Sequence, residues 1–312
     1  MNNNHDLLNL PVFQVAGETK TLRHEFAAGL VAELAGRSLS GIFLPREDDR
    51  ILTRYAVISQ VKLHDLVIID AGLDFPAQQI HLGIHPDGRS VPGSLVWIGG
   101  DDSAMREFID QLIKKLDQLV QQIPVWGCIL IGGKSSRMGR PKHLIEDEKK
   151  VTWLERTASI LRPLVDGLVV SGAGLLPEKL QHLVRLADIP GVVGPLTGVI
   201  AACRWQPTVS WMFVACDMPH ITPEAIQWLL SGRRAGCWGR VPRREESRHC
   251  EPLLACYDFR AGHLFEEQFY NGNLRIGAAA AHPKIENPVI PAALHSGWQN
   301  INTPDELQAA PR

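Results

Sequence analysis

The sequence predicts an α/β protein in which an open, mostly parallel sheet is preceded by a smaller α/β domain. Short apolar runs alternate with helical patterns along the chain. The strongest runs are too continuously apolar for half-exposed strands, which is typical of a sheet covered on both faces. The length of 312 residues exceeds the roughly 150 residues of an average domain. We therefore expect two domains, 1–124 and 125–312.

The first domain begins with a strand and a helix. The run from Val12 to Ala16 predicts the strand, and Leu22, Phe26 and Leu30 at helical spacing predict the helix. Further strands are expected at Gly41 to Leu44, Leu66 to Ile69, Gln79 to Ile84 and Leu95 to Ile98. Asp101 is a good N-cap for an amphipathic helix that should end before Pro124.

The second domain repeats this alternation. Its buried strands are expected at Cys128 to Ile131, Gly167 to Ser171 and Val209 to Cys216. Helix starts are predicted by N-cap signals at Thr152, Thr222 and Thr303, followed by Glu155, Pro223 and Pro304 respectively. Such a sheet places its ligand site at the carboxyl ends of the strands.

The amino-acid composition limits which binding partners and which cellular compartment are expected. A formal charge of -2 argues against general binding to nucleic acid or to an anionic membrane. No basic-then-apolar leader and no span of about 18 apolar residues is visible. The six cysteines form no CxxC pair, which predicts reduced structural thiols in a cytoplasmic protein. His249 beside Cys250 is too little for a metal site.

A glycine-rich loop with fixed positive charge follows the first strand of the second domain. Gly132 and Gly133 let backbone N–H groups turn toward a phosphate, Ser135 adds a donor, and Arg137 and Lys142 add charge. The loop matches neither the Walker pattern nor GxGxxG. It predicts a polyphosphate site, whereas the alternative is a turn with solvated basic residues.

Asp217 ends the most apolar strand of the chain. A carboxylate at that edge can hold Mg²⁺ together with substrate phosphates, although it could also cap the turn that follows. Between this strand and the glycine-rich loop, the segment Ala187 to Gly198 contains three glycines and two prolines. Such a rigid backbone surface is suited to packing against the flat ring of a nucleotide base.

These segments resemble the molybdenum cofactor guanylyltransferases of the MobA type over about residues 125 to 310. The motifs stand in the family's order: the loop Leu130 to Lys142, the segment Asp188 to Gly198, Cys216 to Pro219, Glu251 to Ala255, and Trp298 to Pro304. The resemblance implies a Rossmann-like nucleotidyltransferase sheet and Mg²⁺-dependent transfer of GMP from GTP to molybdopterin. Pyrophosphate would leave, and the product would be molybdopterin guanine dinucleotide.

The resemblance also implies roles for the matched residues. Asp217 would be the metal ligand, and Arg137, Lys142 and Asp217 the catalytic groups. The triphosphate would meet Leu130, Gly132, Gly133, Ser135, Arg137 and Lys142. The nucleoside would meet Asp188, Gly194, Pro195, Leu196 and Gly198, and the pterin side would include Asn300 and Asn302. The implied partners are GTP, molybdopterin, molybdoenzymes and other cofactor-biosynthesis proteins.

Two departures leave alternatives open. The short Gly139 to Lys142 spacing is similar to cytidylyltransferases and sugar-phosphate nucleotidyltransferases, and Ser171 to Gly174 stands where the family often has asparagine. The chain could therefore use another nucleotide or acceptor. A non-catalytic adaptor for nucleotide or cofactor is the alternative from another class, and the coexistence of Arg137, Lys142 and Asp217 speaks against it.

Two further features have a less specific interpretation. Six arginines before Glu251 could form a basic lip for an anionic pterin or a solvated loop: Arg233, Arg234, Arg240, Arg243, Arg244 and Arg248. The first domain resembles a degenerate MobB-like P-loop domain, with Lys20 at the loop and Asp70 after a strand. Gln14 and Thr19 stand where glycines should, which favours a scaffold or docking role over nucleotide hydrolysis.

Overall fold

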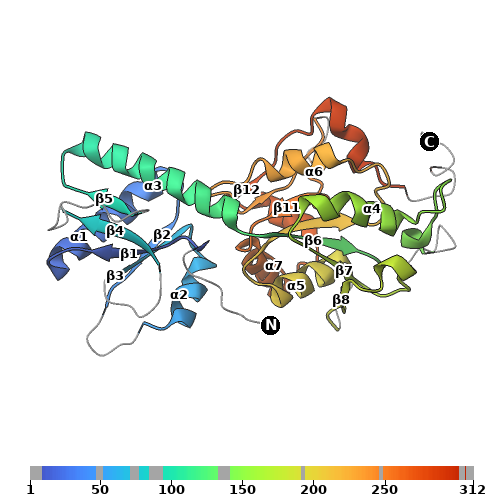
Figure 1. Cartoon of the computed structure of the whole chain (residues 1–312), viewed down its shortest axis with the longest axis horizontal. Coiled ribbons are helices and arrows are strands. Elements are labelled where there is room, and N and C mark those ends of the chain that lie inside the picture. The colour runs from blue at the N-terminus through green and yellow to red at the C-terminus, as the bar shows by residue number, and fades with distance from the viewer. Residues whose placement is uncertain are drawn as a thin grey trace. The chain divides into compact units, whose positions relative to one another are not determined.

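The chain divides into two compact units at Pro124. The computed structural model describes residues 9–46, 52–70, 77–83, 94–132, 141–190, 194–245, 249–301 and 306. Unit 1 comprises residues 1–123 together with Arg234–Gly236, and unit 2 comprises Pro124–Arg233 and residues 237–312. Figure 1 shows a separate sheet in each unit.

Unit 1 is built on a five-stranded, fully parallel sheet in the order β2-β3-β1-β4-β5. The strands are β1 (Val12–Ala16), β2 (Gly41–Leu44), β3 (Leu66–Asp70), β4 (Gln78–Leu82) and β5 (Leu95–Trp97). The helices are α1 (Lys20–Gly36), α2 (Arg54–Val61) and α3 (Asp102–Gln122). One apolar core joins the sheet to α1 and α3, through residues such as Phe13, Leu30 and Leu112.

Unit 2 contains a seven-stranded sheet in the order β12-β10-β11-β9-β6-β7-β8. Strands β9, β6, β7 and β8 are parallel, whereas β11 runs antiparallel to both β9 and β10. The longer strands are β6 (Val125–Leu130), β7 (Gly167–Ser171) and β9 (Ser210–Ala215). The short ones are β8 (Val184–Leu186), β10 (Gly239–Arg240), β11 (Ala255–Tyr257) and β12 (Ile285–Glu286).

Helices cover both faces of the second sheet, as Figure 1 shows. They are α4 (Trp153–Leu161), α5 (Pro195–Trp205), α6 (Pro223–Leu230) and α7 (Ala261–Tyr270). One core packs α4 and α6 against one face, with Leu154 and Ile226 fully buried. The other packs α5 and α7 against the opposite face around Phe213 and Phe265. This two-sided burial explains the continuously apolar strands.

Short 3-10 turns connect these elements and shape the loops of unit 2. They are η2 (Lys142–Leu144), η3 (Arg162–Leu164), η4 (Glu178–Leu180), η5 (Ile276–Ala281) and η6 (Ala292–Trp298). The turn η2 directly follows the glycine-rich loop, whose residues 133–140 lie outside the described part of the chain.

Most of the expected elements are confirmed. All eight expected strands are present within a few residues, and Asp101, Thr152 and Thr222 are N-caps with hydrogen bonds to first-turn amides. Thr152 and Glu155 form the reciprocal capping box. Helices α2 and α7 and strands β8, β10, β11 and β12 were not predicted. The cap at Thr303 lies outside the described residues.

Two further observations concern the cysteines and the helices. All six cysteines are free thiols. Within the described ranges, no helix combines the length and apolarity that crossing a membrane requires.

Candidate functional site

Lys142 and Asp217 form an ion pair at the carboxyl edge of the second sheet. Lys142 Nζ lies 2.9 Å from Asp217 Oδ2, and their side chains are 16% and 21% exposed. Lys142 follows the loop after β6, and Asp217 lies just beyond β9, which pairs with β6 in parallel. Adjacent parallel strands end at the same edge, so residues 75 positions apart meet there.

Backbone hydrogen bonds fix both members of this pair. The turn that carries Lys142 is closed by bonds from Leu144 N to Pro141 O and from Ile145 N to Lys142 O. The amide of Cys216 donates to Leu130 O at 3.2 Å, which joins the ends of β9 and β6. The two charges therefore project from an ordered backbone, which is a requirement for electrostatic catalysis.

Close backbone packing explains the glycines at this edge. Gly132 has a φ of +112°, a conformation that L side chains rarely adopt. Gly172, with a φ of +116°, passes so close to the preceding loop that a Cβ atom would lie 1.9 Å from Ile131 O. Glycine at position 172 is thus a steric requirement of this chain.

The segment expected to bind the nucleoside lies at the start of α5. Gly194 has a φ of +101° and is the N-cap of α5, without a side-chain cap. Thr197 Oγ1 accepts a 2.6 Å hydrogen bond from Ile189 N, which ties the helix start to the exposed stretch that carries Asp188. Pro195 and Leu196 occupy the first helical turn. Gly194 and Pro195 are exposed, whereas Leu196 and Gly198 are buried, so only part of the predicted segment lies at the surface.

A buried hydroxyl group lies below this helix start. Ser171, the last residue of β7, is 1% exposed, and its Oγ has no hydrogen-bond partner within the described residues. Gly198 passes above it, because an added Cβ there would lie 2.8 Å from Ser171 Oγ and 2.6 Å from Leu130 Cδ2. Leu130 and Gly198 are therefore packed together, and both are buried.

The charged edge suits a metal that is shared with a substrate. Asp217 contributes a single carboxylate, and no cluster of three or more His, Cys, Asp or Glu occurs in the described ranges. Mg²⁺ uses one or two carboxylates and completes its shell with water and phosphate oxygens. The donor set therefore fits Mg²⁺ brought with a nucleotide, and it does not fit a closed structural metal site.

No thiol at this edge is available as a nucleophile. Burial and, to a smaller extent, the negative charge of the adjacent Asp217 raise the pKa of Cys216 to about 12. A thiol with such a pKa remains protonated near neutral pH. The arrangement is thus suited to positioning and charge stabilisation, and covalent catalysis by Cys216 is not supported.

Contacts from the C-terminal segment reach this edge. Ile301 N donates to the backbone oxygen of Asp217 at 3.0 Å, which places the exposed Asn300 next to the metal-ligand candidate. Trp298 Nε1 donates to Leu254 O, and Arg244 donates to Trp298 O at 2.8 Å. Arg244 also lies 3.3 Å from a carboxylate oxygen of Glu251.

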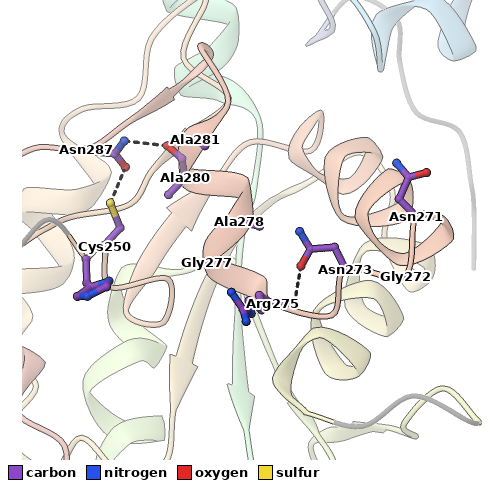
Figure 2. A pocket seen from close by; sticks show the side chains of 11 residues that line it. Cys250, Asn271, Gly272, Asn273, Arg275, Gly277, Ala278, Ala280, Ala281 and Asn287 are labelled. Atoms are coloured by element: carbon purple, nitrogen blue, oxygen red, sulfur yellow. Dashed lines mark hydrogen bonds between the residues drawn. The ribbon is translucent and has the colours of Figure 1, made fainter.

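A polar cavity lies beside His249 and Cys250, the two residues that precede Glu251 in the chain. Its volume is about 860 Å³, and its lining includes Cys250, Asn273, Arg275 and Asn287. Figure 2 shows Asn287 bonded to Cys250 Sγ and to the carbonyl of Ala280; the two bonds measure 3.3 and 2.8 Å. Sequence reasoning missed this cavity, because isolated asparagines and alanines carry no recognisable spacing.

The arginine-rich stretch does not form one uniform surface. Arg240 lies over the ring of Trp228, 4.6 Å from its centroid, and Arg233 approaches Ser210 Oγ at 3.4 Å. Arg234 belongs to unit 1, whereas Arg243 forms a backbone bridge with Cys250 and Arg244 forms an ion pair with Glu251. Only these last two described arginines are therefore candidates for the basic lip.

Several predicted site residues lie outside the described part of the chain. They are Gly133, Ser135, Arg137, Arg248 and Asn302. Their expected roles remain predictions.

In unit 1, an arginine side chain lies at the sheet edge where a phosphate-binding loop was considered. Arg23 forms an ion pair with the buried Asp70 at the end of β3, and its other nitrogen donates to Gly17 O at 2.8 Å. The Thr19 side chain caps α1 by accepting from Leu22 N. A carbonyl and a guanidinium thus occupy the strand edge, where a nucleotide-binding loop presents N–H groups to phosphate.

Comparison with known proteins finds similarity in unit 2. Residues 127–271 match the family described as "MobA-like NTP transferase domain". A protein named "Probable molybdenum cofactor guanylyltransferase" from Pelotomaculum thermopropionicum is 30% identical, and the match covers 59% of this chain and 90% of that protein. "Molybdenum cofactor guanylyltransferase" from Rhizobium meliloti is 33% identical, covering 58% of this chain and 88% of that protein.

Solved structures are also similar, among them the molybdopterin-guanine dinucleotide biosynthesis protein A from Archaeoglobus fulgidus, which is 25% identical with a TM-score of 0.47. The match covers 59% of this chain and 95% of that one.

Proposed function

Because the chain belongs to the MobA-like NTP transferase family, we propose that it transfers GMP from GTP to molybdopterin and releases pyrophosphate. The observation that carries the proposal is the Lys142–Asp217 pair at the carboxyl edge of the parallel strands. That edge is where α/β sheets bind their ligands, and the pair supplies one cation for phosphate and one ligand for a metal. The reducing cytoplasm, suggested by six free thiols, is the proposed compartment.

The reaction requires positioning more than proton transfer. A phosphate oxygen of molybdopterin forms a bond to the α-phosphorus of GTP, and the bond from that phosphorus to the bridging oxygen of the β-phosphate breaks. The electron pair leaves with pyrophosphate. The attacking oxygen already belongs to an anion, so no general base is needed. Lys142 binds the triphosphate and stabilises charge on the leaving group.

Asp217 would hold Mg²⁺, whose charge stabilises the phosphate oxygens of the reacting nucleotide when it is bound. In the structure, the carboxylate is paired with Lys142. We infer that the pair keeps both side chains at the edge before substrate arrives. Lys142 then exchanges this contact for one with the triphosphate.

The polar cavity beside Glu251 is the proposed site of the acceptor. Its volume of about 860 Å³ lies within the usual range for small-molecule pockets. Arg275 provides positive charge for a phosphorylated acceptor, and Asn287 provides a polar contact. Asn300, which lies beside the Asp217 edge, would contact the acceptor's reacting end.

Unit 1 is proposed to be an accessory domain without nucleotide hydrolysis. This proposal is supported by the ion pair of Arg23 with Asp70, the acid that would otherwise be available to a metal. Docking of molybdoenzymes or other cofactor-biosynthesis proteins remains the proposed role of the unit.

The test is pyrophosphate release by the full chain with Mg²⁺ and intact molybdopterin, comparing GTP, CTP, ATP and UTP. We expect release with GTP. Release with CTP alone would identify a cytidylyltransferase instead, and nucleotide binding without release would favour an adaptor. Arg204→Ala is the matched control for Lys142→Ala, because it removes another cation from an ion pair of unit 2, with Glu266, outside the proposed site.

A further inference from the structure

The residue after Lys142 is a histidine with an unusual degree of burial. His143 is 3% exposed, and its Nε2 atom lies 3.0 Å from the carbonyl oxygen of Leu175. Leu175 belongs to the loop that follows β7. Burial lowers the pKa of His143, partly opposed by the bond to Leu175 and assisted by the positive charge of Arg185. A neutral ring with its proton on Nε2 donates to this carbonyl.

The loop after β7 is shaped to receive this imidazole. Gly174 has a φ of +145°, and a Cβ atom there would lie 2.8 Å from Cε1 and 3.0 Å from Nε2 of His143. Arg185 Nε donates to the carbonyl of Gly172 at 3.0 Å and holds the same loop from β8. The histidine is therefore packed against a fixed backbone.

Adjacent residues of one turn thus reach the loops of two different strands. His143 contacts the loop after β7, and Lys142 contacts Asp217 after β9. Strands β7 and β9 lie on the two sides of β6. The turn η2 carries both residues and follows the loop that begins at the end of β6. It therefore connects three neighbouring strand ends.

We propose that His143 is a positioning residue that fixes the direction of Lys142 by anchoring η2 to the loop after β7. The proposal rests on the proposed function, in which Lys142 stabilises charge on the triphosphate. A turn of three residues has few internal bonds of its own, so an anchor at its second residue restricts the backbone of the first. Displacement of a catalytic group by about 1 Å can cost about 10²-fold in rate.

The test uses two substitutions in the full chain. His143→Leu fills the volume but removes the donor, and His143→Gln keeps a side-chain N–H at a similar reach. We expect His143→Leu to lower kcat about 10-fold to 100-fold with little change in the KM for the acceptor. His143→Gln should recover most of this loss. His295→Leu is the matched control, because His295 Nε2 also lies 3.0 Å from a backbone carbonyl, that of Ile290.

A double variant separates positioning from a general structural role. If His143 acts through Lys142, Lys142→Ala/His143→Leu should be no slower than Lys142→Ala alone. A full multiplication of the two losses would overturn the proposal, as would wild-type kcat in a folded His143→Leu variant. Gly174→Ala, whose Cβ would crowd Cε1 and Nε2 of the imidazole, should reproduce the loss in kcat and replaces His143→Leu as the test if that variant does not fold.

Hydrogen exchange gives a readout that does not depend on turnover. His143→Leu should speed amide exchange in residues 141–146 and 172–176 together, whereas His295→Leu should not. If the wild-type chain shows no GTP-dependent release of pyrophosphate, the proposed function fails. The exchange result still tests whether His143 anchors η2 to the loop after β7. Unchanged exchange in both segments would refute the anchor whatever the activity.

Discussion

Lys142 Nζ and Asp217 Oδ2 lie 2.9 Å apart across the ends of β6 and β9, although 75 positions separate them in the chain. The two opposite charges of this pair offset each other. Because both side chains keep some exposure, a polyphosphate and its metal can compete for them. The pair therefore brings together the proposed phosphate-binding cation and the proposed metal ligand.

Removal of either charge should affect turnover far more than stability. We expect Lys142→Ala and Asp217→Asn each to lower kcat by about 10²- to 10³-fold, because each removes a preorganised electrostatic contact. The free energy of unfolding should fall by only about 1 kcal/mol, since a partly exposed pair contributes little to stability. Kinetics and urea denaturation check both values. Comparable turnover in Lys142→Ala and Arg204→Ala would contradict the role of Lys142.

Gly172→Ala should destabilise the protein by about 2–4 kcal/mol, since the new Cβ would overlap Ile131 O in a strained backbone conformation. Urea denaturation measures the loss. Gly83→Ala is the control, because Gly83 also has a positive φ, of +87°, but an added Cβ meets nothing within 4 Å. Equal losses in the two variants would show that backbone strain alone matters and that the close approach does not.

Each chain should bind one GTP molecule. The pairing of Arg23 with Asp70 at the edge of unit 1 predicts that all nucleotide binds to unit 2. Equilibrium dialysis with Mg²⁺ and labelled GTP measures the number of sites, and Arg23→Ala should leave it unchanged. A second site, or loss of binding in Arg23→Ala, would show that unit 1 takes part in nucleotide binding.

Stability should decrease as the pH falls below about 6.5. Burial lowers the pKa of His64, His143, His220 and His282, so the unfolded chain takes up protons before the folded chain does. The stabilisation is therefore complete above the unfolded pKa and is lost as pH falls toward the folded values. For the buried His143, the loss between pH 7.5 and 5.5 should be at most about 1 kcal/mol.

Urea midpoints at the two pH values test this expectation. His143→Gln should show a shallower pH dependence than the wild-type chain, because one titrating group is removed. The same slope in both proteins would mean that His143 does not contribute.

The long elements could be predicted because their patterns are local. Strand β9 is continuously apolar, and α4 begins at a capping box formed by residues three positions apart. Strands β10 and β12, with two residues each, are too short to produce a periodic pattern. The antiparallel pairing of β11 depends on a tertiary contact with β9, which no local pattern encodes.

Some features of the candidate site could likewise be predicted from the sequence, and others could not. Lys142 follows the glycine-rich loop after β6 and Asp217 lies just beyond β9, so their positions at the sheet edge could be inferred from the sequence. Their mutual ion pair, the anchor at His143 and the buried hydroxyl of Ser171 could not, because each depends on the close approach of separate loops. The steric need for glycine at position 172 could not be predicted either, because it depends on the close approach of Ile131 O.

The central claim is transfer of the nucleotide's α-phosphate to molybdopterin. The most direct measurement follows GTP labelled at the α-phosphorus, with the full chain, Mg²⁺ and intact molybdopterin. We predict that the label appears in a molybdopterin guanine dinucleotide, in amounts equal to the pyrophosphate released, and that Lys142→Ala forms little of it. Label that remains in GTP, or appears only in free GMP, would contradict the account.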